Sequence, residues 1–182
     1  MGNKAYTVVK KEDMSVSQWS SGTTTEIYIY PEHASYAMGD FSFRISAAEI
    51  LDNEAVFTPL SGVHRIIMPI TGPITLFLNG GSSFIEPFHA YAFNGGLPTR
   101  SKGKGRDLNL MMINKTGNVE TVSGSVTPKQ GYFTAFYPLD HMTVHIRDET
   151  ITIDGGDFFI NHQDDEMNVE SEAPIVRFEI LM

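Results

Sequence analysis

The chain has 182 residues, 41% of them hydrophobic and 19% charged, and its 22 acids against 13 bases give a formal net charge of −9. This composition predicts a globular protein with a real core and excludes a disordered chain. The acidic balance disfavours nucleic acid as a partner, the absence of cysteine excludes disulfides and thiolate chemistry, and no apolar run is long enough to span a membrane. We therefore expect a cytoplasmic protein.

Short strand-like runs recur along the chain between turns rich in glycine and proline. In chain order they are EIYIYP (26–31), FSFRIS (41–46), VHRIIMPI (63–70), PITLFLNGG (73–81), AYAFNGG (90–96), DLNLMMI (107–113), MTVHI (142–146), ETITIDGGDFFI (149–160) and APIVRFEIL (173–181). No segment has a sustained helical period, and SAAEILDNE (46–54) reads either as a short helix or as a continuing strand. The pattern predicts an all-β sandwich or barrel.

Two lobes are expected within a single compact unit of residues 1–182. The polar stretch NKTGNVETVSGSV (114–126) is the expected junction, with an N-terminal lobe at about 1–118 and a C-terminal lobe at about 119–182. The second lobe has few residues for a closed barrel, so we expect N-terminal strands to complete it.

A faint internal echo supports the two lobes. Residues 73–93 and 149–169 both run strand, Gly-Gly, short strand and turn. Such an echo is typical of a duplication, although in β proteins it also arises by chance.

The six histidines do not form a metal-binding pattern. His141 and His145 are the nearest to a ligand pair, but on a strand residues four apart lie about 13 Å from each other, too far for one ion. The chain also lacks a G-x-S-x-G elbow, and SKGKGRD (101–107) lacks the spacing of a phosphate-binding loop. We therefore predict no metal, no other cofactor and no catalytic residue.

Two arginines lie inside otherwise apolar strands, Arg44 in FSFRIS and Arg65 in VHRIIMPI. An arginine in such a strand must be paired, because burying its charge alone is too costly. One interpretation pairs either arginine with Glu26 or Asp107. The other lets two guanidinium groups line a pocket and bind a ligand carboxylate.

The run GRDLNLMMI (105–113) places polar and apolar side chains on opposite faces. Since successive strand residues alternate, Asp107 and Asn109 share one face while Leu108 and Leu110 share the other. We expect the polar pair to point into a barrel and the leucines to pack outward.

Four segments together resemble the HutD/Ves family, which comprises cupin-like proteins, some encoded with histidine-utilisation enzymes. They are WSSGTTTEIYIYP (19–31), DFSFRISAAEI (40–50), FTPLSGVHRIIMPITG (57–72) and FHAYAFNGG with GRDLNLMMI (88–113). The resemblance implies a double-stranded β-helix fold, as a bicupin of two packed cupin barrels. It also implies no metal, because the H-x-H pair of metal-binding cupins is absent.

Several residues match the family's motifs and could face a pocket. They are Trp19, Thr25, Glu26, Arg44, Ser46, His64, Arg65, Asp107 and Asn109. From these we predict a ligand-binding set of Glu26, Arg44, His64, Arg65, Asp107 and Asn109.

The resemblance implies a non-catalytic binder of a small carboxylate-containing metabolite, such as urocanate or a formylated glutamate derivative, with a regulatory role in histidine utilisation. Two alternatives stay open. One is a metal-free isomerase or lyase with His64 or His89 as general base, oriented by Asp107 or Glu26. The other is an interaction protein that forms a homodimer and binds no ligand.

Overall fold

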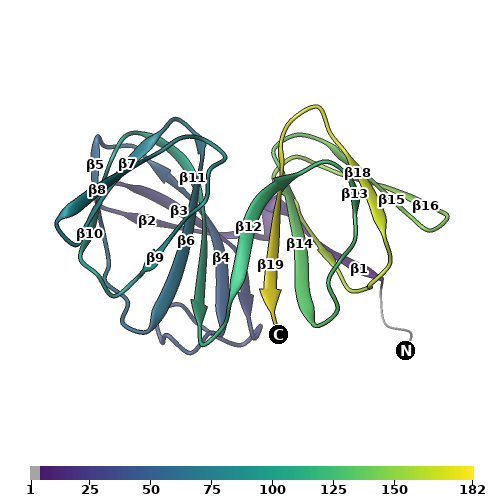
Figure 1. Cartoon of the computed structure of the whole chain (residues 1–182), viewed down its shortest axis with the longest axis horizontal. Helices are drawn as coiled ribbons and strands as arrows, with labels where there is room; N and C mark the ends of the chain where they lie inside the picture. Colours follow the sequence, from purple (N-terminus) through teal and green to yellow (C-terminus); the bar gives the residue numbers. More distant parts are fainter. Residues whose placement is uncertain (1–4) are drawn as a thin grey trace. The chain divides into compact units, whose positions relative to one another are not determined.

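A computed structural model describes residues 5–182 and contains strands and short turns (Figure 1). Within this range the one helical segment is a single 3-10 turn at Lys11–Asp13, and no helix has the length and apolarity needed to cross a membrane. The prediction of an all-β chain is therefore confirmed. The chain divides into two compact units, one of Ser15–Lys115 and the other of residues up to Met14 together with Thr116–Met182.

The Ser15–Lys115 unit is built from two antiparallel sheets. The six-stranded sheet has the order β2 (Ser15–Trp19), β3 (Gly22–Tyr30), β4 (Phe43–Ile50), β11 (Gly105–Ile113), β6 (Val63–Thr71) and β9 (Tyr91–Asn94). The four-stranded sheet has the order β5 (Glu54–Phe57), β10 (Thr99–Lys102), β7 (Ile74–Leu78) and β8 (Gly81–Ile85). Ile67 and Phe93 of the larger sheet pack with Ile74, Leu76 and Ile85 of the smaller one. This apolar cluster fills only part of the space between the two sheets.

The other unit also has two antiparallel sheets. The five-stranded sheet has the order β1 (Tyr6–Val9), β17 (Phe158–Asn161), β14 (Tyr132–Pro138), β19 (Ile175–Leu181) and β12 (Gly117–Val122). The four-stranded sheet has the order β13 (Gly124–Val126), β18 (Met167–Glu170), β15 (Met142–Ile146) and β16 (Glu149–Ile153). Buried side chains from both sheets form one apolar core, which includes Phe136, Phe159, Met142, Val144 and Met167.

The two units repeat one strand order. The larger sheets contain β4-β11-β6-β9 and β12-β19-β14-β17, and the smaller sheets are β5-β10-β7-β8 and β13-β18-β15-β16. Strands β4 to β11 therefore correspond in order to β12 to β19. This correspondence pairs β7 to β9 with β15 to β17, so the predicted match of 73–93 with 149–169 is displaced by one strand.

Several elements differ from the sequence-based expectation. Residues 46–50 continue strand β4, so the helical alternative for 46–54 is wrong. The polar stretch 114–126 contains strands β12 and β13. The sequence did not indicate them, because the valines among its polar residues form a pattern too short to predict a strand. Strand β14 (YFTAFYP) gave no clear signal, since it is bounded by proline and apolar on both faces.

The first strand, β1, belongs to the unit that contains the C-terminal residues Thr116–Met182. Strand β1 pairs with β17, and Lys10 just after it places its ammonium Nζ 2.6 Å from Oδ2 of the buried Asp157. The backbone N–H of Lys11 donates to the other carboxylate oxygen at 3.0 Å. The pKa of Lys10 is raised, mainly by its hydrogen bond to Asp157. A single buried carboxylate thus fixes the end of β1.

Candidate functional site

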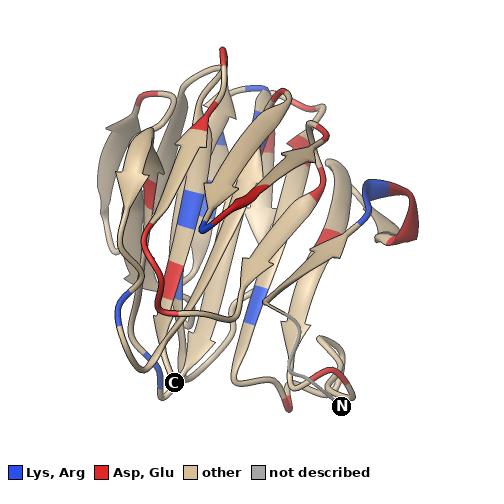
Figure 2. Cartoon of the chain, turned by 90° about the vertical axis from the view of Figure 1, so that its right-hand side faces the viewer, with Lys and Arg blue, Asp and Glu red and all other residues tan. Residues whose placement is uncertain are grey.

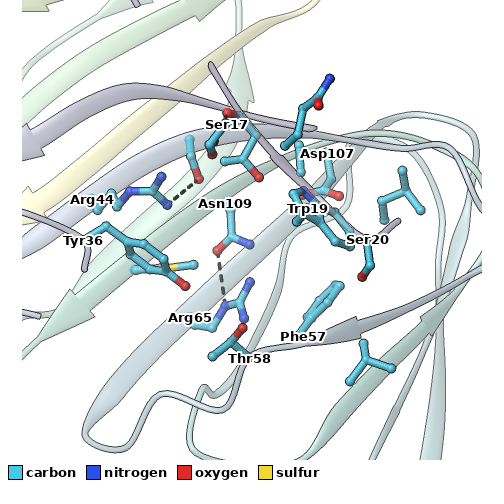
Figure 3. A pocket seen from close by; sticks show the side chains of 17 residues that line it. Ser17, Trp19, Ser20, Tyr36, Arg44, Phe57, Thr58, Arg65, Asp107 and Asn109 are labelled. Carbon is cyan, nitrogen blue, oxygen red and sulfur yellow. Dashed lines mark hydrogen bonds between the residues drawn. The ribbon is translucent and has the colours of Figure 1, made fainter. Parts of the chain in front are cut away.

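A cavity of about 360 Å³ lies within the Ser15–Lys115 unit (Figure 3). Its walls come from β2, β4, β6 and β11 of the larger sheet, from the end of β5, and from the loop after β3. This volume is at the lower end of the range for small-molecule sites. The walls combine aromatic rings with arginine, aspartate, asparagine and serine side chains.

Strand β11 forms the polar floor of the cavity. Asp107, Asn109 and Met111 all line it and are 2%, 5% and 5% exposed, whereas Leu108 and Leu110 lie on the opposite face and are also buried. The alternation along GRDLNLMMI therefore separates a polar cavity face from an apolar one. In the sheet register Met111 lies opposite Arg44 on one side and Arg65 on the other. Both arginines consequently line the same cavity.

Arg44 is held in place by three neighbours. Its Nε donates to Oε2 of Glu26 at 2.7 Å, and its Nη1 donates to the Ser46 hydroxyl at 3.3 Å. The Tyr36 ring lies 4.4 Å from the guanidinium carbon, within cation–π range. The ion pair with Glu26 is the internal pairing that the sequence left open, and it coexists with a place in the cavity wall.

Arg65 is held differently. Its Nε donates to the Asn109 side-chain oxygen at 3.4 Å, and the rings of Phe57 and Phe93 lie 4.9 and 5.2 Å from its guanidinium carbon. Burial lowers the pKa of Arg65 to about 10, with the charge of Asp107 opposing that shift. Gly95 leaves room for the side chain, because a Cβ there would lie 2.9 Å from the Arg65 Cδ. Arg65 makes no ion pair with an acid of residues 5–182 and so offers its charge to the cavity.

Two polar groups in the cavity wall lack a partner within the described chain. They are the Asp107 carboxylate oxygen Oδ1 and the Trp19 indole Nε1. Burial raises the pKa of the Asp107 carboxyl to about 7, and the charge of Arg65 opposes this rise. Figure 3 shows Asp107 beside Trp19, with Asn109 between the two arginines. The cavity therefore presents two cations at one end and an unsatisfied acceptor and donor at the other.

Two residues of the predicted set do not line the cavity. His64 is exposed, because it is adjacent to Arg65 on β6 and neighbouring strand residues point to opposite faces. Glu26 acts through Arg44 instead of lining the wall. His89 is exposed as well and its ring bonds to the Pro87 carbonyl oxygen. Both histidines are exposed and neither lines the cavity with Asp107, so the isomerase or lyase alternative has no histidine base in this cavity.

Of the remaining histidines, His33 is exposed in the loop after β3, whereas His141, His145 and His162 lie in the other unit with separate partners. The His141 ring is 3.2 Å from Asp154, and His145 bonds to the Thr150 hydroxyl. Within residues 5–182 no three His, Cys, Asp or Glu side chains converge on a point where they could hold a metal ion.

Sequence reasoning missed two aromatic residues of the site. Tyr36 lies in the polar loop EHASYAMGD, which has no strand periodicity to indicate the direction of its side chain. Phe57 ends β5 and stacks on Arg65. It begins the motif FTPLSGVHRIIMPITG, so the family resemblance contained a signal for it.

Comparison with known proteins places the fold. A family model described as HutD matches residues 11–176. A conserved Pseudomonas aeruginosa protein of unknown function is similar over 98% of both chains, with a TM-score of 0.80 and 17% identity. HutD from Pseudomonas fluorescens SBW25, in a formate condition, has a TM-score of 0.77 and 21% identity over 97% of this chain and 98% of that one.

Bacillus subtilis oxalate decarboxylase, which has Mn(II) centres, has a TM-score of 0.64 and 11% identity over 100% of this chain and 78% of that one. No curated protein matches by sequence. The fold is therefore cupin-like and all-β, and the described side chains do not supply a ligand set for a Mn(II) centre.

Proposed function

We propose that this chain, which belongs to the HutD family, binds a small carboxylate-containing metabolite in the cavity without a metal and has a regulatory role in histidine utilisation. The observation that carries the proposal is the pair of buried arginines, Arg44 and Arg65, in one cavity wall. Glu26 forms an ion pair with Arg44 only, and Asp107 attracts Arg65 without forming an ion pair with it, so the arginine end of the cavity favours an anion. We place this role in the cytoplasm, as expected from the sequence.

The opposite end of the cavity supports a ligand that carries an amide or an imidazole. Such a group both donates and accepts, and it would satisfy the Asp107 Oδ1 acceptor and the Trp19 N–H donor that have no partner within the described residues. Met111, which the arginines flank, and Asp107 lie about 13 Å apart along β11 at strand spacing. The distance that a ligand must span is smaller, because the long arginine side chains extend into the cavity. Urocanate and formylated glutamate derivatives are compatible with this arrangement.

The repeated strand order supports a finer proposal for the fold. The two units would be the two cupin barrels of a bicupin, with N-terminal strand β1 contributing to the second. Only the Ser15–Lys115 unit would then carry the carboxylate site, because apolar side chains occupy the centre of the other.

The first test is a thermal-shift screen against urocanate, formylglutamate, formiminoglutamate, histidine, formate and divalent metals with a chelator control. A ligand at a hundred times its dissociation constant stabilises a fold by about 2.7 kcal/mol, which such a screen detects. Stabilisation by one carboxylate and by no metal is the expected result. A shift with metals alone would contradict the proposal.

Replacing either cavity arginine with alanine should weaken binding of that carboxylate by about ten- to a hundredfold, because a charge-assisted contact is lost. Fluorescence of Trp19, the one tryptophan of the chain and part of the cavity wall, measures the affinity. Arg44→Lys keeps the charge but loses the planar fork and should fall between wild type and Arg44→Ala.

Arg100→Ala is the matched control, since Arg100 is exposed and lies over Phe77 outside this cavity. Unchanged affinity in Arg44→Ala would remove the arginines from the binding role.

The homodimer is also a proposal. Val56 and Phe84 are 69% and 66% exposed on the outer face of the four-stranded sheet, where apolar side chains of this size can form an interface. If that face joins two copies, Phe84→Lys should shift the protein to a later, monomeric elution in size-exclusion chromatography. A wild-type chain that elutes as a monomer at high concentration would exclude the dimer.

A further inference from the structure

A second polar cavity lies in the unit formed by residues up to Met14 and Thr116–Met182. It has a volume of about 490 Å³ and lies at the ends of β14 and β17, where Thr134, Asn161, Gln163 and Asp164 line it. Thr134 is 1% exposed, and the sheet register places it directly opposite Asn161 and Glu179. This site shares no residue with the arginine-lined cavity.

Two side-chain oxygens here are buried without a partner in the described chain. They are the Thr134 hydroxyl Oγ1 and the Gln163 carbonyl Oε1. The Asn161 amide bonds elsewhere: it donates to the Gln163 backbone carbonyl at 2.6 Å and accepts from the Gln163 N–H at 3.2 Å. The same two bonds fix the turn that carries Gln163. The acceptors are therefore held in place and unsatisfied, which is uncommon for buried polar atoms.

The third acceptor is the carboxylate of Asp164, which is exposed and has no ion-pair partner among residues 5–182. A hydroxyl, an amide oxygen and a carboxylate around one space match the three N–H donors of a primary ammonium group. Phe133 and Met182 also line the cavity and offer apolar surface to a short alkyl chain. Figure 2 shows the Lys and Arg positions of the chain as separate blue segments among the red Asp and Glu positions.

An ammonium group of the chain itself already binds next to this cavity. The Lys129 Nζ lies 2.8 Å from Oε2 of Glu179, the buried residue opposite Thr134, and 5.6 Å from the centre of the Tyr132 ring, which lines the cavity. The pKa of Lys129 is raised, mainly by its hydrogen bond to Glu179. The surroundings therefore stabilise a primary ammonium ion at one position and leave acceptors for another.

We propose that this cavity is a separate ligand site that binds the ammonium group of a small primary amine through Thr134, Gln163 and Asp164. The bound amine donates one hydrogen bond to each of the three oxygens, and its alkyl chain packs toward Phe133 and Met182. The site is independent of the carboxylate site and would be present whether or not that proposal holds.

The test is an NMR titration of the full chain with propylammonium chloride. Saturable shifts are expected for the backbone amides of residues 132–134 and 161–164. Propanol and sodium propionate, which match the alkyl chain without the cation, should not produce them, and neither should sodium chloride at equal ionic strength. Thr134→Val and Asp164→Asn should each weaken the propylammonium affinity by about tenfold.

Two controls make the result decisive. Asp148→Asn removes an exposed acid elsewhere in the same unit and should leave the affinity unchanged, as should Asp52→Asn at an exposed turn of the Ser15–Lys115 unit. Full retention of binding in both Thr134→Val and Asp164→Asn would overturn the proposal. An equal loss in Asp148→Asn and Asp164→Asn would overturn it too, because net charge alone would then explain the shifts.

Discussion

Replacing Asp107 with asparagine is expected to stabilise the unliganded protein above pH 7 and to leave its stability near pH 4 almost unchanged. Burial raises the pKa of this carboxyl from 3.8 to about 7, against the opposing charge of Arg65. Between these two pH values the folded chain keeps a proton that the unfolded chain has released. The resulting stability is therefore complete below the unfolded pKa and is lost as the pH rises through about 7. Asparagine is neutral at every pH and does not incur this loss.

The expected gain above pH 7 is about 4 kcal/mol at most, from the conversion of this pKa difference into free energy. This difference already includes the attraction between Asp107 and Arg65, because that charge lowers the pKa that burial raises. Urea unfolding followed by Trp19 fluorescence measures the gain, because Trp19 lines the same cavity. Asp52→Asn, at an exposed turn before β5, should give no pH-dependent difference. A difference between wild type and Asp107→Asn that stays constant from acid to neutral pH would contradict the argument.

Replacing Gly105 with alanine should destabilise the Ser15–Lys115 unit by about 3 kcal/mol or more. Gly105 has a φ of +145°, and a Cβ there would lie 1.8 Å from the Thr71 carbonyl oxygen. That oxygen belongs to the backbone of β6, so no side-chain rotation relieves the clash. The pairing of β11 with β6 shifts register just after this point, between Arg106 and Asp107. The same change should therefore displace Asp107 in the cavity.

Gly81→Ala is the matched control for this experiment. Its nearest neighbour would be the Leu78 carbonyl oxygen at 3.8 Å, an ordinary contact, and its φ is not positive. We expect a change within about 0.5 kcal/mol in thermal or urea unfolding. Equal stability of Gly105→Ala and Gly81→Ala would show that β11 accepts a side chain at its start.

Much of the cavity face of β11 could be predicted because its sequence alternates polar and apolar residues. Asp107 and Asn109 stand out among leucines and methionines, and Arg44 and Arg65 stand out in apolar strands. Burial of such groups is costly, so their positions indicate a special environment. The sequence could not predict which acid pairs with each buried arginine. Glu26 reaches Arg44 because β3 lies next to β4 with Glu26 opposite Ser46, a register that only the folded sheet defines.

The assignment of His64 could have been avoided from the sequence. It stands next to Arg65 on one strand, and two neighbours cannot both face the same cavity. Tyr36 is different, since a loop has no period from which to predict a direction. The sequence comparison aligned residues 73–93 with 149–169, which is displaced by one strand from the structural correspondence. The reason is that the two Gly-Gly pairs lie in turns that do not correspond, one between β7 and β8 and the other between β16 and β17.

The pairing of β1 with β17 has a consequence for synthesis on the ribosome. Residues 6–9 leave the exit tunnel well before their partner strand at 158–161, which is made about 150 residues later. At a translation rate of about 5–20 residues per second, this delay is on the order of ten seconds or more. During that time the inserted Ser15–Lys115 segment, which contains all its own strands, can fold. Until β17 is made, the backbone groups of β1 lack their partner strand and are accessible to chaperones and to other nascent chains.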